Sequence, residues 1–157
     1  MTLTAQKTTL GLAAPVLALA LSFGARTASA DIAREGDLHI EKNCSQYSGA
    51  AGSFCTIISS NLAALPVHSR IFYDQAAGVP NPNPPGGMLD SNILIYVGPG
   101  NWAVGRCTLD NNTNLGLCSL SDGVGPLTGI TMRVTVSSPD GINYFWNGTY
   151  AFRSLFH

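Results

Sequence analysis

The chain has 157 residues, of which 45% are hydrophobic and only 11% are charged, and its formal net charge is −1. No basic stripe for nucleic acid and no polybasic patch for a membrane surface occurs in the sequence. We therefore expect neither of these partners, and a chain this apolar is expected to form a packed core.

The first thirty residues resemble an export signal. Lys7 supplies the positive charge, Leu10–Phe23 is an apolar run, and Ala28-Ser29-Ala30 is a small-x-small cleavage pattern. A membrane anchor is the alternative, but Gly11 and Pro15 interrupt the run. We predict bacterial export with cleavage after Ala30, a secreted or periplasmic location, and no membrane span after cleavage.

Residues 31–157 are then one domain of 127 residues with six basic and nine acidic side chains. All four cysteines lie in this part, and an even count in an exported chain favours disulfides. The spacing favours Cys44–Cys55 and Cys107–Cys118, because each pair is eleven residues apart and brackets a turn-rich segment. Zinc is the rival interpretation, but no C-x-x-C and no nearby histidine pair supports it.

Three short strands are predicted before residue 74. Residues 37–41 alternate briefly, residues 54–60 are rich in β-branched side chains, and residues 67–73 alternate over their whole length. In the third strand, Val67, Ser69, Ile71 and Tyr73 are expected on one face and His68, Arg70 and Phe72 on the other. Residues 61–65 are expected to form one helical turn at most.

The segment from Asp74 to Asp90 contains four prolines and three glycines, which exclude a ladder strand or a helix. A loop this long in a small domain is either functional or a passive connector. Both interpretations, a lid and a connector, stay open.

The second half of the chain predicts a run of consecutive strands. Residues 91–97 form one strand, and residues 102–110 and 115–120 form a hairpin. Opposing Cys107 with Cys118 in an antiparallel pair also opposes Leu109 with Gly116 and centres the turn between Asn112 and Thr113. The register and the disulfide therefore support each other.

Residues 121–129 are predicted to be loop, and residues 130–137 alternate strictly, with Ile130, Met132, Val134 and Val136 pointing inward. Residues 138–141 have turn composition. Residues 142–152 are predicted to be one bent strand with a kink at Gly148, although Asn147-Gly148 is also a possible hairpin turn. Seven or eight short strands predict an all-β fold, an antiparallel small barrel whose closure removes exposed edges.

Several short strings are similar to a bacterial secreted family that we associate with the allene oxide cyclase and dirigent β-barrel group: Gly49–Thr56 (GAAGSFCT), Ser60–Leu62 (SNL), Val104–Leu109 (VGRCTL), Gly116–Leu120 (GLCSL), Gly123–Gly125 (GVG) and Trp146–Phe152 (WNGTYAF). The resemblance implies an eight-stranded up-and-down barrel with a ligand-sized interior, in a group whose plant members are often trimers, so a homo-oligomer is an expectation. The lumenal acids of that group match no residue here, and its catalytic residues stay unassigned.

No catalytic motif is present: the sequence has no G-x-S-x-G, no H-E-x-x-H and no unpaired cysteine. Asp110-x-Asn112-x-Asn114 resembles the start of a calcium loop, but its glycine falls one place late, and the same letters suit a hairpin turn. No metal and no cofactor are therefore predicted. A few polar or aromatic side chains from strands are candidates to line a ligand site in the barrel: His68, Tyr73, Tyr96, Arg106, Trp146 and Tyr150.

The sequence thus predicts a secreted barrel that binds a small apolar ligand or surface without catalysis. The alternative is a cyclase or isomerase that acts on a small hydrophobic substrate in the lumen. An acidic side chain pointing into the lumen would favour the enzyme.

Overall fold

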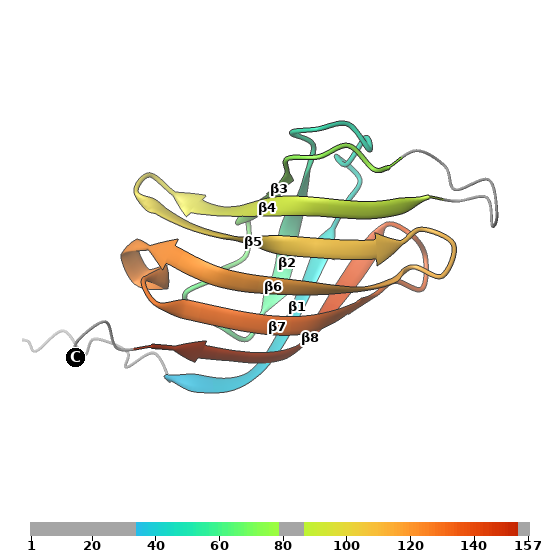
Figure 1. The fold of residues 1–157 in the computed structure, drawn as a ribbon. Helices are drawn as coiled ribbons and strands as arrows, with labels where there is room; N and C mark the ends of the chain where they lie inside the picture. The colour runs from blue at the N-terminus through green and yellow to red at the C-terminus, as the bar shows by residue number, and fades with distance from the viewer. Residues whose placement is uncertain (1–33, 79–86, 154–157) are drawn as a thin grey trace, which may run out of the picture. The chain divides into compact units, whose positions relative to one another are not determined.

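The structure is a computed structural model that describes residues 34–78 and 87–153. The expected all-β class is confirmed: eight antiparallel strands close a barrel, each strand pairing with its neighbours in sequence and β1 pairing with β8 (Figure 1). The strands are β1 (Glu35–Asn43), β2 (Phe54–Ser60), β3 (Arg70–Tyr73), β4 (Met88–Gly98), β5 (Asn101–Asp110), β6 (Leu115–Val124), β7 (Ile130–Ser137) and β8 (Asn143–Phe152).

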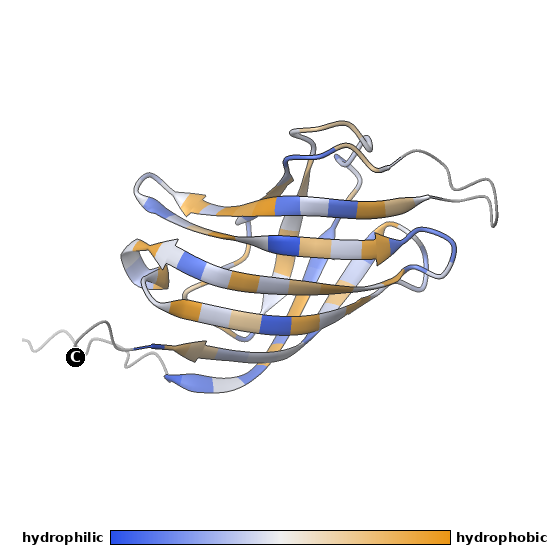
Figure 2. Ribbon diagram, in the orientation of Figure 1, coloured by the Kyte–Doolittle hydropathy of each residue, from blue (hydrophilic) through white to orange (hydrophobic). Residues whose placement is uncertain are grey.

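The alternation of side chains explains why these segments form the wall. Hydrophobic and hydrophilic residues alternate along the strands in Figure 2. On β7, Ile130, Met132, Val134 and Val136 are buried as predicted, while Arg133 and Thr135 are exposed. Period-two alternation gives each strand one inner and one outer face, so a closed sheet gathers the inner faces into one core.

Both predicted disulfides are present, Cys44–Cys55 and Cys107–Cys118. The predicted register is also confirmed, because Cys107 lies opposite Cys118 and Leu109 opposite Gly116. Asp110 ends β5, and its Oδ1 accepts a hydrogen bond of 2.8 Å from the backbone N–H of Asn112. Asn114 follows in the left-handed conformation, with φ of 55°. The Asp and Asn residues of this turn therefore fold the hairpin.

β8 is one continuous strand, as predicted, and Asn147-Gly148 is not a turn. Gly148 lies opposite Val134 on β7. A Cβ atom on Gly148 would collide with the backbone carbonyl oxygen of Arg133 and with Cα of Val134. Glycine at this position therefore lets β7 and β8 approach closely.

The start of β3 differs from the prediction. Val67 is 46% exposed and precedes β3, and His68 lies in a turn with φ of 71°, because the backbone turns there after Pro66. Residues 61–65 form a single turn, within the limit that was predicted, with the Leu65 N–H donating to the Leu62 carbonyl at 2.9 Å.

The remaining differences lengthen strands. Met88–Asp90 belong to β4, and Ser121–Val124 extend β6 before a short 3₁₀ helix, Gly125–Leu127. Pairing with β5 explains both extensions, since Leu89 lies opposite Leu109 and Gly123 opposite Ala103. Residues 79–86 of the predicted lid or connector lie outside the described residues.

Apolar side chains close one end of the barrel. The β2–β3 and β6–β7 connections lie at this end and contribute the buried residues Leu62, Leu65 and Leu127 to the core. The opposite end carries the β1–β2, β5–β6 and β7–β8 connections, and the last two lie at the right of Figure 1. A cavity with one buried charged side chain opens at this second end. No helix among residues 34–78 and 87–153 has the length and apolar character needed to cross a membrane.

Candidate functional site

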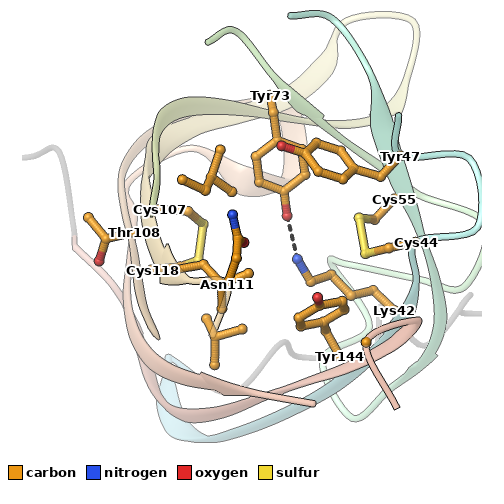
Figure 3. Close-up of a pocket in the computed structure, with 14 residues that line it drawn as sticks. Lys42, Cys44, Tyr47, Cys55, Tyr73, Cys107, Thr108, Asn111, Cys118 and Tyr144 are labelled. Carbon is orange, nitrogen blue, oxygen red and sulfur yellow. Dashed lines mark hydrogen bonds between the residues drawn. A yellow bond between two sulfur atoms is a disulfide. The ribbon is translucent and has the colours of Figure 1, made fainter. Parts of the chain in front are cut away.

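The candidate site is a cavity at the open end of the barrel (Figure 3). Its volume, measured as the room for the centres of water molecules, is about 90 Å³. One water needs about 10–15 Å³ by this measure, so the cavity has room for several waters or a small organic molecule. The exposed residues Asn111 and Gly141 lie at its rim, which opens it to solvent.

Lys42 supplies the one charged side chain among the described residues that line the cavity. It follows Leu38 and Ile40 on the inner face of β1, and all three are buried. On the neighbouring strand Lys42 lies opposite Tyr144 and Ile40 opposite Trp146. The alternation of β1 therefore carries the lysine side chain into the lumen, where only 3% of it is exposed.

Aromatic side chains surround the Lys42 amine. Its Nζ donates a hydrogen bond to the hydroxyl oxygen of Tyr73 on β3. The Nζ also lies 5.1 Å from the ring centroid of Tyr73, 5.4 Å from that of Tyr144 and 4.7 Å from that of Trp146. A ring face within about 6 Å attracts a cation, so the Tyr144 and Trp146 rings favour the charged form of the amine, while Tyr73 contacts it through its hydroxyl.

Burial acts in the opposite direction and has the larger effect. Removal from water lowers the pKa of Lys42 from 10.5 to about 7. The pKa of Tyr73 is raised above its ordinary value, first by burial and then by the neighbouring Tyr47 and Tyr144. At neutral pH the site therefore holds a phenol that keeps its proton and an amine close to half protonated.

Tyr47 extends the polar part of the site. It lies in the β1–β2 connection, and its ring packs edge-on against Tyr73 with centroids 5.1 Å apart. Its hydroxyl is buried and has no hydrogen-bond partner within the described part of the chain. A buried hydroxyl without a partner is costly, which makes it a candidate contact for a ligand.

The walls of the cavity are apolar. They include both disulfides and the side chains of Leu89, Leu109 and Val136. Cys44–Cys55 joins β2 to the segment after Lys42, and Cys107–Cys118 clasps β5 to β6 on another side of the lumen (Figure 3). The covalent links therefore fix the wall around the amine.

No carboxylate lines this cavity among residues 34–78 and 87–153. Every described aspartate or glutamate is exposed or half-buried. The described residues also hold no cluster of three or more histidine, cysteine or acidic side chains that could bind a metal ion. The Lys42 amine is thus buried without an opposite charge, an arrangement that buried charges usually avoid.

Two of the six predicted site residues lie beside the Lys42 amine. Tyr73 is its hydrogen-bond partner, and Trp146 is a fully buried core residue whose ring faces it. Tyr150 is also buried, but it lies further along β8, packs edge-on against Phe152 and lines a separate groove with residues of β1 and β7.

The other three predicted residues lie outside the lumen. His68 is exposed in its turn, and Tyr96 is 39% exposed on the outer face of β4. Arg106 points outward and pairs with Asp90 at 2.7 Å. The structure does not bring these three residues together with Tyr73.

Sequence reasoning missed Lys42. The signal was the alternation of Leu38 and Ile40, which predicts an inward position two residues later. Two facts weaken that signal: lysine is usually exposed, and the pairing of β1 with β2 shifts register between Glu41 and Lys42.

Comparison with protein-family models, with curated proteins and with solved structures found no match. The resemblance to the allene oxide cyclase and dirigent group therefore stays a prediction.

Proposed function

We propose that this barrel is a binding module for a small ligand with an apolar body and one polar group. The polar group contacts Lys42, Tyr73 and Tyr47, and the apolar body lies against the walls of the cavity. Ligand sites are commonly apolar pockets in which a few polar groups fix the orientation.

The observation that carries this proposal is the buried Lys42 amine at an open cavity without a carboxylate partner. A lysine that served only the fold would be expected to reach water or an acid. A ligand that accepts hydrogen bonds would pair with the amine and with the free hydroxyl of Tyr47. The enzymatic alternative needs a lumenal acid, and the described residues supply none.

The test uses butanamide and butanoate as probes, because they present different polar groups on the same short chain. Binding is followed by ligand-observed NMR with the full chain, and we expect a Kd that rises at least about tenfold in Lys42→Met, which corresponds to the loss of one hydrogen bond to a charged group. Arg106→Met is the matched control, since it removes an exposed cation from the outer wall. Equal binding by both variants, or no binding of either probe, would contradict the proposal.

A second experiment looks for the natural ligand. The protein is purified from its own producer and analysed by native mass spectrometry. We expect a small molecule that is released on unfolding. Protein that is always empty would count against the binding module.

We further infer that the barrel works outside the cytoplasm after removal of residues 1–30. Two disulfides fit an oxidising compartment, which supports this inference. N-terminal sequencing of the protein from its producer tests it. The expected first residue is Asp31, and a chain that retains residues 1–30 would contradict cleavage.

A further inference from the structure

We propose that Lys42 captures small aldehydes, by forming an imine between its Nζ and the carbonyl carbon of the ligand. This inference rests on the proposed function, because it names the ligand class of the same cavity. It adds a reversible covalent bond to the non-covalent binding of the ligand.

The first support is the placement of lysine in this chain. The sequence contains two lysines, Lys7 and Lys42, so Lys42 is the only lysine among residues 34–78 and 87–153. That single amine is buried beside a cavity and not on the surface. Desolvation in an apolar pocket is a known way to turn a lysine into a nucleophile.

The second support is the set of groups that face the amine. Tyr73 comes from β3, and Tyr144 and Trp146 come from β8, while Tyr47 of the β1–β2 connection packs against Tyr73. None of them is charged at neutral pH, and no carboxylate among the described residues lines the cavity to hold the amine in its ammonium form. Burial also lowers the pKa of Lys42 to about 7, so about half of the molecules carry a free lone pair at pH 7.

The step balances without a redox partner. The Nζ lone pair attacks the carbonyl carbon, and one proton of the nitrogen moves to the carbonyl oxygen, which gives a carbinolamine. That oxygen takes a second proton and leaves as water while the nitrogen forms the C=N bond. The Tyr73 hydroxyl, in hydrogen-bond contact with Nζ, is placed to pass the proton and to recover it. Amine and aldehyde thus become imine and water.

The surroundings also favour the product. The imine that forms is neutral, so it avoids the cost of burial that opposes a positive charge at this position. The hydrocarbon chain of the aldehyde would lie against Leu89, Leu109 and Val136. The volume of about 90 Å³ selects short chains.

The experiment traps the imine in the full chain carrying Lys7→Arg, so that Lys42 is its only lysine. The protein is mixed with butanal and sodium cyanoborohydride at pH 7, and intact mass and peptide mapping locate the butyl group. The comparison chain, Lys7→Arg/Lys42→Met/Arg133→Lys, carries its only lysine at an exposed position on the outer face of β7. We expect labelling at Lys42 to be about 10- to 100-fold faster than at the lysine introduced at position 133. At pH 7 the neutral fraction of the amine is roughly a thousandfold larger at Lys42 than at position 133. The expected ratio of labelling rates is smaller than this, because a weaker base is also a weaker nucleophile.

Two further readouts separate chemistry from folding. The labelling rate at Lys42 should rise with a midpoint near pH 7, whereas the rate at position 133 should keep rising toward its ordinary pKa. Tyr73→Phe keeps the ring and removes the proton relay, and it should slow labelling at Lys42 by roughly tenfold or more.

Labelling at Lys42 that is no faster than at position 133 would overturn the inference. If Lys42 is not labelled but butanamide still binds in a Lys42-dependent manner, the aldehyde inference fails and the proposed function stands. If neither result is obtained, both fail.

Discussion

Replacing Lys42 by methionine should change how folding stability depends on pH. Below pH 7 the amine carries a proton in both the folded and the unfolded chain, so the cost of burying the charge is fully present. Between about pH 7 and 10.5 the folded chain has lost this proton while the unfolded chain still binds it. Because the unfolded state then holds more protons, the stability of the natural chain rises with pH in this window.

The magnitude follows from the shift in pKa from 10.5 to about 7. Each pH unit is worth about 1.4 kcal/mol, so the full effect is about 5 kcal/mol. The tyrosines restrict the usable range. Tyr73, Tyr47 and Tyr144 all have raised pKa values, so they oppose the trend as pH exceeds 10. Between pH 7 and 9.5 we expect a gain of about 2–3 kcal/mol in the natural chain relative to Lys42→Met.

Lys42→Met should also be the more stable chain at pH 6. It loses the cost of the buried charge but leaves the Tyr73 hydroxyl without its partner, which costs about 1–3 kcal/mol. The net gain at pH 6 is therefore about 2–4 kcal/mol. Lys42→Met/Tyr73→Phe removes the unpaired hydroxyl as well and serves as the matched control.

The assay is urea unfolding with the disulfides intact, followed by tryptophan fluorescence at a series of pH values. The quantity to plot is the difference in free energy of unfolding between the natural chain and Lys42→Met, because groups far from the site cancel in it. A difference that does not change between pH 6 and 9.5 would refute the reasoning, since it would show that the amine keeps an ordinary pKa.

The remaining predictions concern the frame of the site. Asp140→Asn should make the barrel less stable at neutral pH and remove part of its acid sensitivity, as measured by unfolding from pH 2 to 6. Hydrogen bonds from the backbone of Asn143 and Ile142 lower the pKa of Asp140 from 3.8 to about 2. The ionised carboxylate therefore stabilises the fold above pH 4, and this contribution is lost as pH falls through 2. A similar pH profile in both chains would contradict this. Serine at both Cys107 and Cys118 should cost about 3 kcal/mol in urea unfolding from loop entropy, and no change in midpoint would contradict the clasp. Gly148→Ala should lower stability by about 1–3 kcal/mol through the collision with the Arg133 carbonyl, whereas a neutral effect would show that β7 and β8 lie further apart.

The fold could be predicted from the sequence where local patterns agreed with one another. The spacing of Cys107 and Cys118 fixed both a disulfide and a register, and the alternation from Ile130 to Val136 fixed an inner face. The predicted ends of strands were wrong where pairing with a neighbouring strand extends the strand beyond its local pattern. Ser121–Val124 have loop composition, yet pairing with β5 keeps Asp122 and Gly123 in the sheet.

The candidate site could be predicted only in part. Tyr73 and Trp146 were found because the alternation of side chains along a strand predicts which aromatic residues lie on its inner face. Lys42 was missed because composition assigns lysine to the surface, and only the three-dimensional arrangement places Tyr73, Tyr144 and Trp146 around it. No local pattern specifies which end of the barrel is closed. In the structure the buried side chains of Leu62, Leu65 and Leu127 fill one end, and the site lies at the other.

The most direct test of the central claim is an NMR titration of the Lys42 side chain. The full chain is labelled with ¹³C at the lysine ε-carbons, and Lys42→Met assigns the signal. We predict a titration midpoint near pH 7 and a shift of this signal when butanamide is added at constant pH. A midpoint near the ordinary 10.5, with no response to the probe, would contradict the account of a buried, ligand-accessible amine.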